Sequence, residues 1–540
     1  GSKADLNLEE VTSTGTVRIK TQGSIINATG NQTTINVAGE NIVLEAGQGS
    51  IGTQGAQILL DVEANTSITA RASGDIYLIE TSGDMEVGTL FSQQGGIQLT
   101  ANQGAVVDAL NHDFANVSAK TYFVVSALNG VGEVGDALEI DMQGSGDEFI
   151  SVTTTTGDIL LSELVGNMSI KRIQTGGGDI TLTAQGSILD VADAGADSAD
   201  SGSLNYVSSL PKADVVGNNI SLTATTGNIG LSGNDLDINT AANAAGSLTT
   251  SSGLSTYLIE TEGDLSIDTI DSGLVGGAVN TSEAFILSFG RILNSRSTGV
   301  NVNSGKVQLF AVGDIGTASK SLETQIGFLE GKSETGNVWL TNTGHLVVGG
   351  LANEKGLTAI GNIDLKANSP ITIDKDLRST DGDISISSSD EADPLADFLL
   401  IENDIEVIAE GGSIFLSSGD NLTISAGAKV FAANTLSIEL DANNADTAGV
   451  DMLINGTIAA TEITVNAAGD NDNLIFNTAI ANNVINDALG NKLSDVLTNS
   501  LTINTGAGID TLAFNKSVSA TTVSINLGDG NNQLDLAATK

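Results

Sequence analysis

The sequence predicts an all-β protein, a right-handed parallel β-helix with rungs of about 20 residues and loop insertions. Three observations predict it: a short phrase recurs along the chain, its copies have a regular spacing, and the composition is unusual. Glycine contributes 64 of the 540 residues, proline only 3, and aromatic residues 3 %. Because 40 % of the residues are apolar, the chain has enough aliphatic side chains to fold, unlike a glycine-rich disordered segment.

The recurring phrase is a small residue, any residue, Ile or Val, any residue, and Leu or Ile. Four of its copies begin at Gly74, Gly95, Gly157 and Gly178, and the first and last pairs are each 21 residues apart. The period-two alternation indicates short strands with one buried face, and glycine with Asn or Asp between them is expected to supply positive φ at tight corners. Such a unit cannot bury its apolar face alone, so successive units must stack, at about 4.8 Å per rung.

The competing all-β architecture is a string of immunoglobulin-like sandwiches. Those domains have about 100 residues and usually a buried tryptophan. The period here is about five times shorter, and the only tryptophan is Trp339. The spacing therefore favours the β-helix.

The chain divides into three regions. Residues 1–14 are a tag and leading segment, since Gly1-Ser2 is typical of a cloning scar. Residues 15–430 hold the β-helix repeats, with predicted insertions at 107–148, 190–216 and 388–398, where the alternation is weak or the composition acidic. Residues 431–540 hold Asn- and Asp-rich repeats that we expect to continue the solenoid. Residues 481–500 carry Val484, Leu489, Leu493 and Leu497 at near-helical spacing and predict a short helical insertion.

The C-terminal region contains three segments that align without gaps over 14 residues: 463–476, 501–514 and 523–536. Oxygen-bearing side chains recur at their turns, and Ca²⁺ takes six to eight oxygen ligands. The candidate metal ligands are Asp451, Asn466, Asp470, Asp472, Asn504, Asp510, Asn526, Asp529 and Asn531. Two interpretations stay open: Ca²⁺ bound at stacked turns, or ordinary Asn and Asp corners that stack through side-chain hydrogen bonds.

Charge and residue usage limit the function. With 66 acidic and 21 basic residues the net charge is −45, which excludes nucleic acid as a partner and does not favour an anionic membrane. No apolar run is long enough to insert into a membrane, and cysteine is absent. The two histidines, His112 and His345, lie in unrelated contexts, and Arg291 and Arg296 are the only close arginine pair. No catalytic motif is present, so we expect no enzymatic activity.

The phrase Gly178–Ile188, GDITLTAQGSI, with its copies at 219–229 and 40–51, resembles the repeats of filamentous-haemagglutinin-type bacterial exoproteins. The C-terminal segments resemble the calcium-binding repeats of RTX adhesins. These resemblances imply a right-handed β-helix that is secreted to the surface of a Gram-negative cell and acts in attachment, aggregation or biofilm formation. They also imply a monomeric fragment of a larger protein, whose partner is a host or bacterial surface glycan or protein, or a matrix polysaccharide.

We therefore expect a segment of an extracellular adhesin rod. The alternative is a β-helix that binds or degrades polysaccharide. The two differ in their surface, because a polysaccharide site requires a groove with convergent Asp, Arg and Lys side chains and exposed aromatic rings, whereas a plain scaffold does not.

Overall fold

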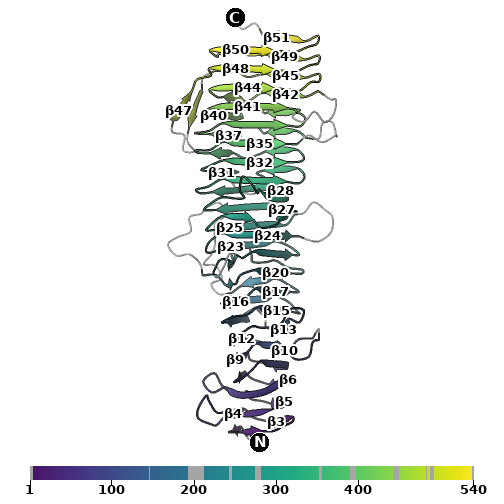
Figure 1. The fold of residues 1–540 in the computed structure, drawn as a ribbon, viewed down its shortest axis with the longest axis vertical. Helices are drawn as coiled ribbons and strands as arrows, with labels where there is room; N and C mark the ends of the chain where they lie inside the picture. Colours follow the sequence, from purple (N-terminus) through teal and green to yellow (C-terminus); the bar gives the residue numbers. More distant parts are fainter. Residues whose placement is uncertain are drawn as a thin grey trace. The chain divides into compact units, whose positions relative to one another are not determined.

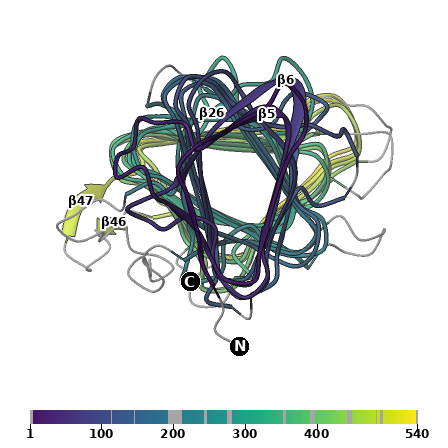
Figure 2. The ribbon, with the colours of Figure 1, turned by 90° about the horizontal axis from the view of Figure 1, so that it is seen from below.

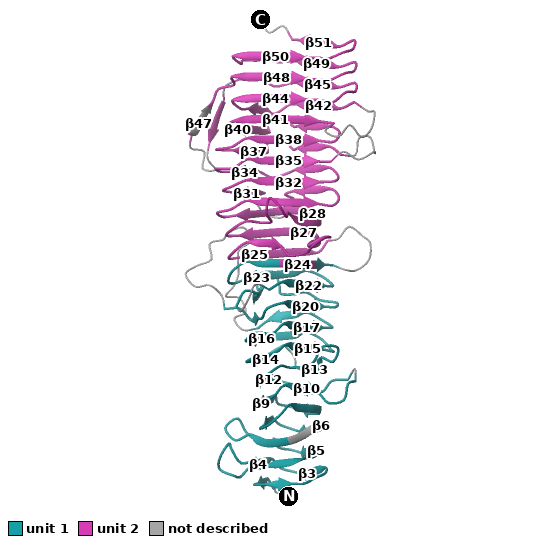
Figure 3. Ribbon diagram, viewed as in Figure 1, with its two compact units in different colours: residues 1–198, 206–266, 271–276 teal, residues 199–205, 267–270, 277–540 magenta. Residues whose placement is uncertain are grey.

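The computed structural model describes residues 4–112, 114–144, 146–191, 212–242, 246–273, 281–351, 356–389, 397–441, 449–481, 483–486 and 492–537. All regular elements in these ranges are β-strands (Figure 1). The strands pair in parallel and form a β-solenoid of about 20 turns, so the predicted parallel β-helix is confirmed. The chain divides into two compact units (Figure 3), residues 1–198, 206–266 and 271–276, and residues 199–205, 267–270 and 277–540.

Unit 1 begins with long strands that pair in parallel: β3 (Val17–Thr21), β5 (Val37–Ala46), β6 (Ile58–Ala72) and β8 (Met85–Ser92). One of its later ladders contains β7 (Ile76–Glu80), β9 (Ile97–Ala101), β12 (Tyr122–Ala127), β14 (Phe149–Thr154) and β16 (Met168–Thr175). Another contains β15 (Ile159–Glu163), β17 (Ile180–Ala184), β20 (Ile220–Ala224) and β22 (Leu248–Ser252).

Among the described residues, three parallel ladders of unit 2 extend from β29, β30 and β31. The first contains β29 (Val338–Asn342), β32 (Ile363–Ala367), β35 (Ile384–Ser388), β38 (Ile414–Ser418), β41 (Thr435–Leu440), β44 (Glu462–Asn466), β48 (Ser500–Asn504) and β50 (Thr522–Asn526). The second contains β30 (Leu346–Val348), β33 (Ile371–Ile373), β36 (Leu399–Ile401), β39 (Leu422–Ile424), β42 (Asp451–Ile454), β45 (Asn473–Phe476), β49 (Thr511–Phe514) and β51 (Gln533–Leu536). The third contains β31 (Leu357–Ala359), β34 (Leu377–Ser379), β37 (Glu406–Ala409), β40 (Lys429–Ala432) and β43 (Thr457–Ala459).

The core of each unit consists of aliphatic side chains stacked rung on rung. In unit 1, Ile159, Ile180 and Ile220 are register partners and all are buried. In unit 2, Ile363, Ile384 and Ile414 form the same kind of column. Viewed end-on, the rungs of each unit wind around a common axis (Figure 2), and the buried aliphatic side chains lie on the inward faces of the strands. Period-two alternation thus places one aliphatic face of the strand inward in these columns.

The glycine of the recurring phrase is required by the close approach of successive rungs. A Cβ atom on Gly178 would lie 2.1 Å from the carbonyl oxygen of Gly157, and one on Gly382 would lie 2.3 Å from the carbonyl carbon of Gly361. The expectation that corner glycines supply positive φ is confirmed at Gly157, with φ of 78°, and wrong at Gly178 and Gly382, which have no positive φ. Positive φ occurs at other turns, for example at Gly316 with φ of 68°.

The polar residue after that glycine links the rungs through hydrogen bonds. In unit 2 the Oδ1 atom of Asp314 accepts the backbone N–H of Asn337 at 2.8 Å, and the Oδ1 of Asn337 accepts that of Asn362 at 2.7 Å. The series continues to Asp383 at 2.8 Å and to Ser413 at 2.7 Å. We call this series the corner ladder. It explains the preference of the repeat for Asp, Asn and Ser at this position.

Of the three predicted insertions, one needs correction, and most of the other two lies outside the described residues. Most of 107–148 is regular solenoid, because β11 (Val117–Ala119), β12 and β13 (Leu138–Met142) all pair in parallel within it. Asn116 within it is buried, and its Nδ2 donates to the Oδ1 of Asp108 at 2.5 Å. Of 190–216 and 388–398, the structure describes only 190–191 and 212–216, and 388–389 and 397–398, so most of both predicted insertions lies outside the described residues.

The predicted helix at 481–500 is wrong. Its described residues form two antiparallel strands, β46 (Asn483–Asn486) and β47 (Lys492–Val496), which extend from the side of unit 2 (Figure 1). Ile485 and Val496 are buried against Ile408, Phe431 and Ala459 of the solenoid. Asn and β-branched residues have low helix propensity, and the β-branched Ile485 and Val496 also favour strands. Their packing on the solenoid outweighs the near-helical spacing of the apolar residues.

Candidate functional site

The asparagines among the predicted metal ligands form a hydrogen-bonded column. Asn466, Asn504 and Asn526 are register partners at the ends of β44, β48 and β50. The Nδ2 of Asn504 donates to the Oδ1 of Asn466 at 2.8 Å, and the Nδ2 of Asn466 donates to the Oε1 of Glu439 at 2.7 Å. The Oδ1 of Asn526 accepts the N–H of Gly528 at 3.1 Å. These amide groups therefore already have partners within the chain.

The aspartates among the predicted ligands form a second column, at the corner before β45 and β49. Asp510 is fully buried: its Oδ1 accepts the N–H of Asp472 at 3.1 Å, and its Oδ2 accepts the hydroxyl of Thr505 at 2.7 Å. Asp472 accepts the N–H of Val450 at 3.1 Å, and burial raises its pKa to about 7. Asp451, at the start of β42, is exposed and accepts the Nδ2 of Asn473 at 3.0 Å.

The remaining predicted ligands lie in turns. Asp470 is half-buried, and Asp529 and Asn531 are exposed near the end of unit 2. Among the residues that the structure describes, no group of three or more His, Asp or Glu side chains has the geometry to hold a metal ion. The structure brings Asp472 together with Asp510 and Asn466 together with Asn504, but in separate columns. Calcium binding stays a prediction, and the hydrogen bonds match the alternative of stacked Asn and Asp corners.

Two buried glutamates terminate strands of unit 1, a role that sequence analysis missed. Both carboxylate oxygens of Glu163, in β15, accept the N–H of Met142 at 3.2 Å. In β23 (Thr256–Glu260), the carboxylate of Glu260 accepts the N–H of Thr240 at 3.1 Å and its hydroxyl at 2.7 Å. Burial raises the pKa of both glutamates to about 8. Because both are buried, they belong to the structural core.

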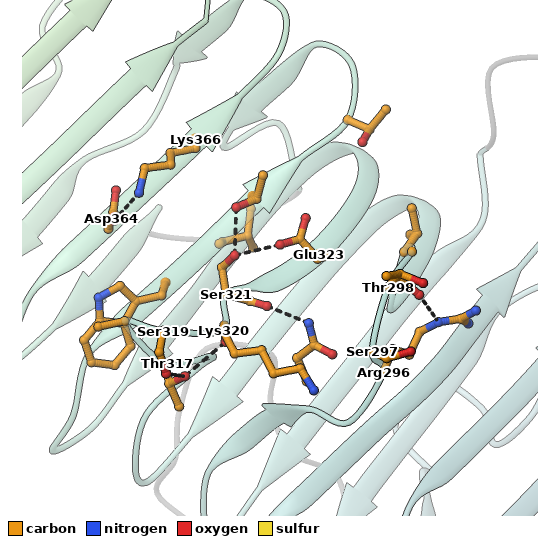
Figure 4. A pocket seen from close by; sticks show the side chains of 18 residues that line it. Arg296, Ser297, Thr298, Thr317, Ser319, Lys320, Ser321, Glu323, Asp364 and Lys366 are labelled. Carbon is orange, nitrogen blue, oxygen red and sulfur yellow. Dashed lines mark hydrogen bonds and ion pairs between the residues drawn. The ribbon is translucent and has the colours of Figure 1, made fainter.

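Unit 2 has a surface cleft of about 490 Å³. This size is in the range of small-molecule sites, about 300–1,000 Å³. It lies where the turn after β26 (Ile292–Asn294) faces a tight hairpin, Thr317–Lys320, and the outer faces of β28 (Leu322–Ser333), β29 and β32 (Figure 4). The side chains that line the cleft include Arg296, Lys320, Glu323, Trp339, Asp364 and Lys366.

Strand register sets the wall of this cleft. Trp339 and Asp364 are register partners on the outward faces of β29 and β32, and Thr341 pairs with Lys366 two positions along. The hairpin opposite starts at Gly316, where a Cβ would lie 2.3 Å from the carbonyl oxygen of Trp339. Glycine at this point therefore allows the hairpin to lie directly against the strand that carries the tryptophan.

Hydrogen bonds hold the floor of the cleft. The Oγ of Ser321 donates to Glu323 at 2.8 Å and lies 2.8 Å from the hydroxyl of Thr341, and the Nδ2 of Asn294 donates to the carbonyl of Ser321 at 2.8 Å. Arg296 donates to the carbonyl of Thr298 at 3.1 Å and to the hydroxyl of Thr269. In Figure 4, Lys366 and Asp364 lie on one side of Ser321, and Arg296 with Thr298 lies on the other.

The cleft is unusual in charge for so acidic a chain. Among the described residues, neither Arg296 nor the exposed Lys320 has a carboxylate partner, whereas Lys366 pairs with Asp364 at 2.7 Å. Residues 291–366 contain seven of the chain's 21 basic residues and six acidic ones, so this stretch is close to neutral while the chain carries −45. Sequence analysis noted Arg296 and Trp339 but did not bring them together; the local excess of basic residues was the available signal.

The two histidines do not contribute to the cleft. The ring of His112 lies 5.6 Å from that of Phe114 in unit 1. His345, in unit 2, lies 3.2 Å from the hydroxyl of Thr372, and burial lowers its pKa. They are therefore separate, as their sequence contexts indicated.

Comparison with known proteins identifies no relative: no family model matches the chain, and no curated protein or solved structure gives a match. The described residues contain no helix that is long and apolar enough to cross a bilayer.

Proposed function

We propose that this chain is a repeat segment of an extracellular adhesin, a scaffold that supports cell attachment, aggregation or biofilm formation. The observation that carries the proposal is the parallel rung-to-rung pairing within each unit, eight strands long in one ladder of unit 2. The stability of a solenoid is a sum of contacts between neighbouring rungs, so such a fold is extended by adding rungs and carries loops on its outside. This is the architecture expected of a scaffold without catalytic activity.

The proposed location is outside a Gram-negative cell, on its surface or secreted. The high negative charge supports this location because it keeps a long repeat protein soluble and opposes self-association. The absence of cysteine is compatible with it, since the hydrogen-bonded ladders replace disulfides as the source of rigidity. The proposed partners are surface glycans, surface proteins or matrix polysaccharide.

Attachment of coated particles tests this proposal. Latex beads that carry the purified chain should bind bacterial or host cells, or a polysaccharide matrix, more than beads that carry an equally acidic globular protein. Equal binding of the two kinds of bead would contradict an adhesive role.

A second candidate function, saccharide binding on the β-helix surface, is favoured by the cleft around Trp339. It combines an aromatic ring with basic and acidic side chains, the combination that distinguishes a saccharide site from a plain scaffold. A glycan array tests binding, and a uronate-cleavage screen tests degradation. We expect binding without cleavage; release of unsaturated or reducing ends would show that the chain is an enzyme.

Calcium binding by the C-terminal turns remains a further proposal. A ligand that binds only the folded protein raises its melting temperature. Addition of millimolar Ca²⁺ to chelated protein should therefore raise the melting temperature if the turns bind it. An unchanged temperature would leave the Asn and Asp columns as hydrogen-bonded ladders only.

A further inference from the structure

We infer that the cleft between the Thr317–Lys320 hairpin and strands β28, β29 and β32 binds an acidic saccharide. One sugar ring would lie against Trp339, and the carboxylate or sulfate would be held by Arg296 and Lys320. This inference rests on the second proposed function, saccharide binding, and narrows it to an anionic ligand and to named residues.

Trp339 supplies the apolar surface of the cleft. Trp339 is half-buried on an outward-facing position of β29, and it lines the cleft. None of the described residues places another aromatic ring or a cation over its indole. An aromatic ring that is held by its strand and open on one side offers a flat apolar surface, and it can be buried by a sugar ring at little conformational cost.

Arg296 and Lys320 place positive charge in the lining of the cleft. Acidic residues outnumber basic ones 66 to 21, so carboxylates are plentiful, yet neither of these cations pairs with one among the described residues. Arg296 is instead held by Thr269 and Thr298, which fix its guanidinium. A fixed guanidinium with unused donors binds carboxylate or sulfate oxygens in a defined geometry.

The cleft also supplies hydrogen-bonding partners for sugar hydroxyls. Glu323 and Asp364 accept hydrogen bonds or pair with a lysine within the cleft, and Ser319, Ser321 and Thr343 add hydroxyl groups to its lining. Sugar hydroxyls donate to carboxylates and accept from hydroxyls and ammonium groups. In Figure 4 the Lys320 side chain extends from the hairpin toward the side on which Arg296 lies.

The chain offers a direct reporter for this site. Because Trp339 is the only tryptophan among 540 residues, fluorescence excited where tyrosine does not absorb reports on this position alone. We would titrate the full chain with an oligogalacturonate, with its carboxyl-reduced neutral counterpart and with a heparin-derived oligosaccharide, and follow both fluorescence and calorimetric heat. We expect a fluorescence change with one or both acidic probes, and roughly tenfold weaker binding of the neutral one.

Matched variants locate the charges. Lys320→Gln alters an exposed side chain that makes no described side-chain contact and should weaken binding roughly tenfold, as should Arg296→Gln. The double variant Lys306→Gln/Lys332→Gln removes two charges from the same unit outside the cleft and should change affinity less than about twofold. Binding should also weaken as salt is raised, and this test requires no variant.

The outcomes are distinguishable. If the neutral oligosaccharide binds as tightly as the acidic ones, saccharide binding stands and the anionic preference is wrong. If calorimetry detects binding while Trp339 fluorescence and the Lys320→Gln variant show no effect, the saccharide binds elsewhere and the cleft assignment is wrong. If no probe binds, both the inference and the second proposed function fail. A response to the uronate but not to the sulfated probe, or the reverse, identifies the acidic group.

Discussion

At successive corners of unit 2, a side-chain oxygen accepts the backbone N–H of the next rung. The corner ladder from Asp314 through Asp383 to Ser413 repeats this bond over successive rungs of unit 2. A single hydrogen bond contributes only about 0.5–1.5 kcal/mol, so the ladder stabilises the fold by its repetition. This hydrogen bond accounts for the Asp of the Gly-Asp phrase, and the close approach of successive rungs accounts for its glycine.

We expect Asp383→Ala to weaken the local rung contact by about 1 kcal/mol, because the N–H of Ser413 loses its acceptor at 2.7 Å. Asp383→Asn keeps an acceptor oxygen and should cost less. Amide hydrogen exchange at Ser413 measures the effect. The matched control is Asp381→Ala, an exposed residue at the same corner with no described side-chain partner. Equal exchange in Asp383→Ala and in the control would contradict the ladder.

The adjacent glycines Gly177 and Gly178 distinguish two reasons for glycine, the close approach of the backbone of another rung and the need for a flexible backbone. A Cβ on Gly178 would lie 2.1 Å from the Gly157 carbonyl oxygen, whereas one on Gly177 would meet nothing within 4 Å. Gly178→Ala should therefore lower the melting temperature of unit 1, with a loss of at least about 2 kcal/mol. Gly177→Ala should be neutral or stabilising by a few tenths of a kcal/mol. Thermal unfolding compares them, and similar melting temperatures would refute the steric account.

The role of a residue could be predicted from sequence where a pattern repeats. It could not be predicted where the role depends on contacts with a neighbouring rung. The alternation identifies buried positions such as Ile180 and Ile384, because the period of a strand is fixed. It cannot show that Gly178 is needed for contact with the previous rung, nor that Glu163 and Glu260 are buried strand terminators. Those roles depend on which residue lies on the neighbouring rung, and insertions of variable length hide that register in the sequence.

At the scale of elements, the antiparallel pair β46–β47 is the clearest departure from the solenoid. It packs through Ile485 and Val496 on a small apolar cluster of unit 2, and Arg378 donates to the carbonyl of Asn486 at 3.0 Å. Near-helical spacing suggested a helix, but a segment this short takes the structure that its packing partners favour. The strand pair is therefore a satellite held by few contacts.

We expect Ile485→Ala to release this pair, since removing a buried isoleucine costs about 2–5 kcal/mol. Limited proteolysis should then cut between Asn483 and Val496 faster, while the solenoid keeps its melting temperature. Leu497→Ala is the control, because Leu497 is 55 % exposed. Unchanged cleavage in the Ile485→Ala variant would show that the cluster does not hold the strands.

Two features that belong to the whole chain are its charge and its buried carboxyl groups. Burial raises the pKa of Glu163 and Glu260 to about 8, from an ordinary value of 4.5, and that of Asp472 to about 7. The folded chain therefore holds protons that the unfolded chain releases between about pH 4.5 and 8. Stability must fall as pH rises through this window, by up to about 1.4 kcal/mol per pH unit for each such group.

We expect the melting temperature to be higher at pH 5 than at pH 8. The double variant Glu163→Gln/Glu260→Gln should flatten this dependence, because glutamine keeps an acceptor oxygen and does not ionise. The exposed substitution Glu462→Gln should leave the slope as it is. Thermal melts across this range measure the slope. If the double variant retained the full slope, general charge repulsion rather than the buried glutamates would be responsible.

The fold class could be predicted from the sequence because one rule, a short strand with one apolar face, is repeated many times. The cleft around Trp339 could not, since Arg296, Lys320 and Lys366 come from three separate rungs or turns. Only the register that pairs Trp339 with Asp364 brings them together. The near-neutral charge of residues 291–366 would have indicated this part of the chain but not the arrangement of its side chains.

The most direct test of the account is the rung spacing within unit 2. Ser385, Phe415, Ser437, Thr464, Thr502 and Ser524 are successive register partners. The chain has no cysteine, so pairs of introduced cysteines can carry spin labels without further changes. Electron–electron resonance should give about 19 Å between positions 385 and 502 and about 24 Å between 385 and 524, or about 4.8 Å per rung. Distances that do not increase evenly along this column would contradict the stacked parallel β-helix.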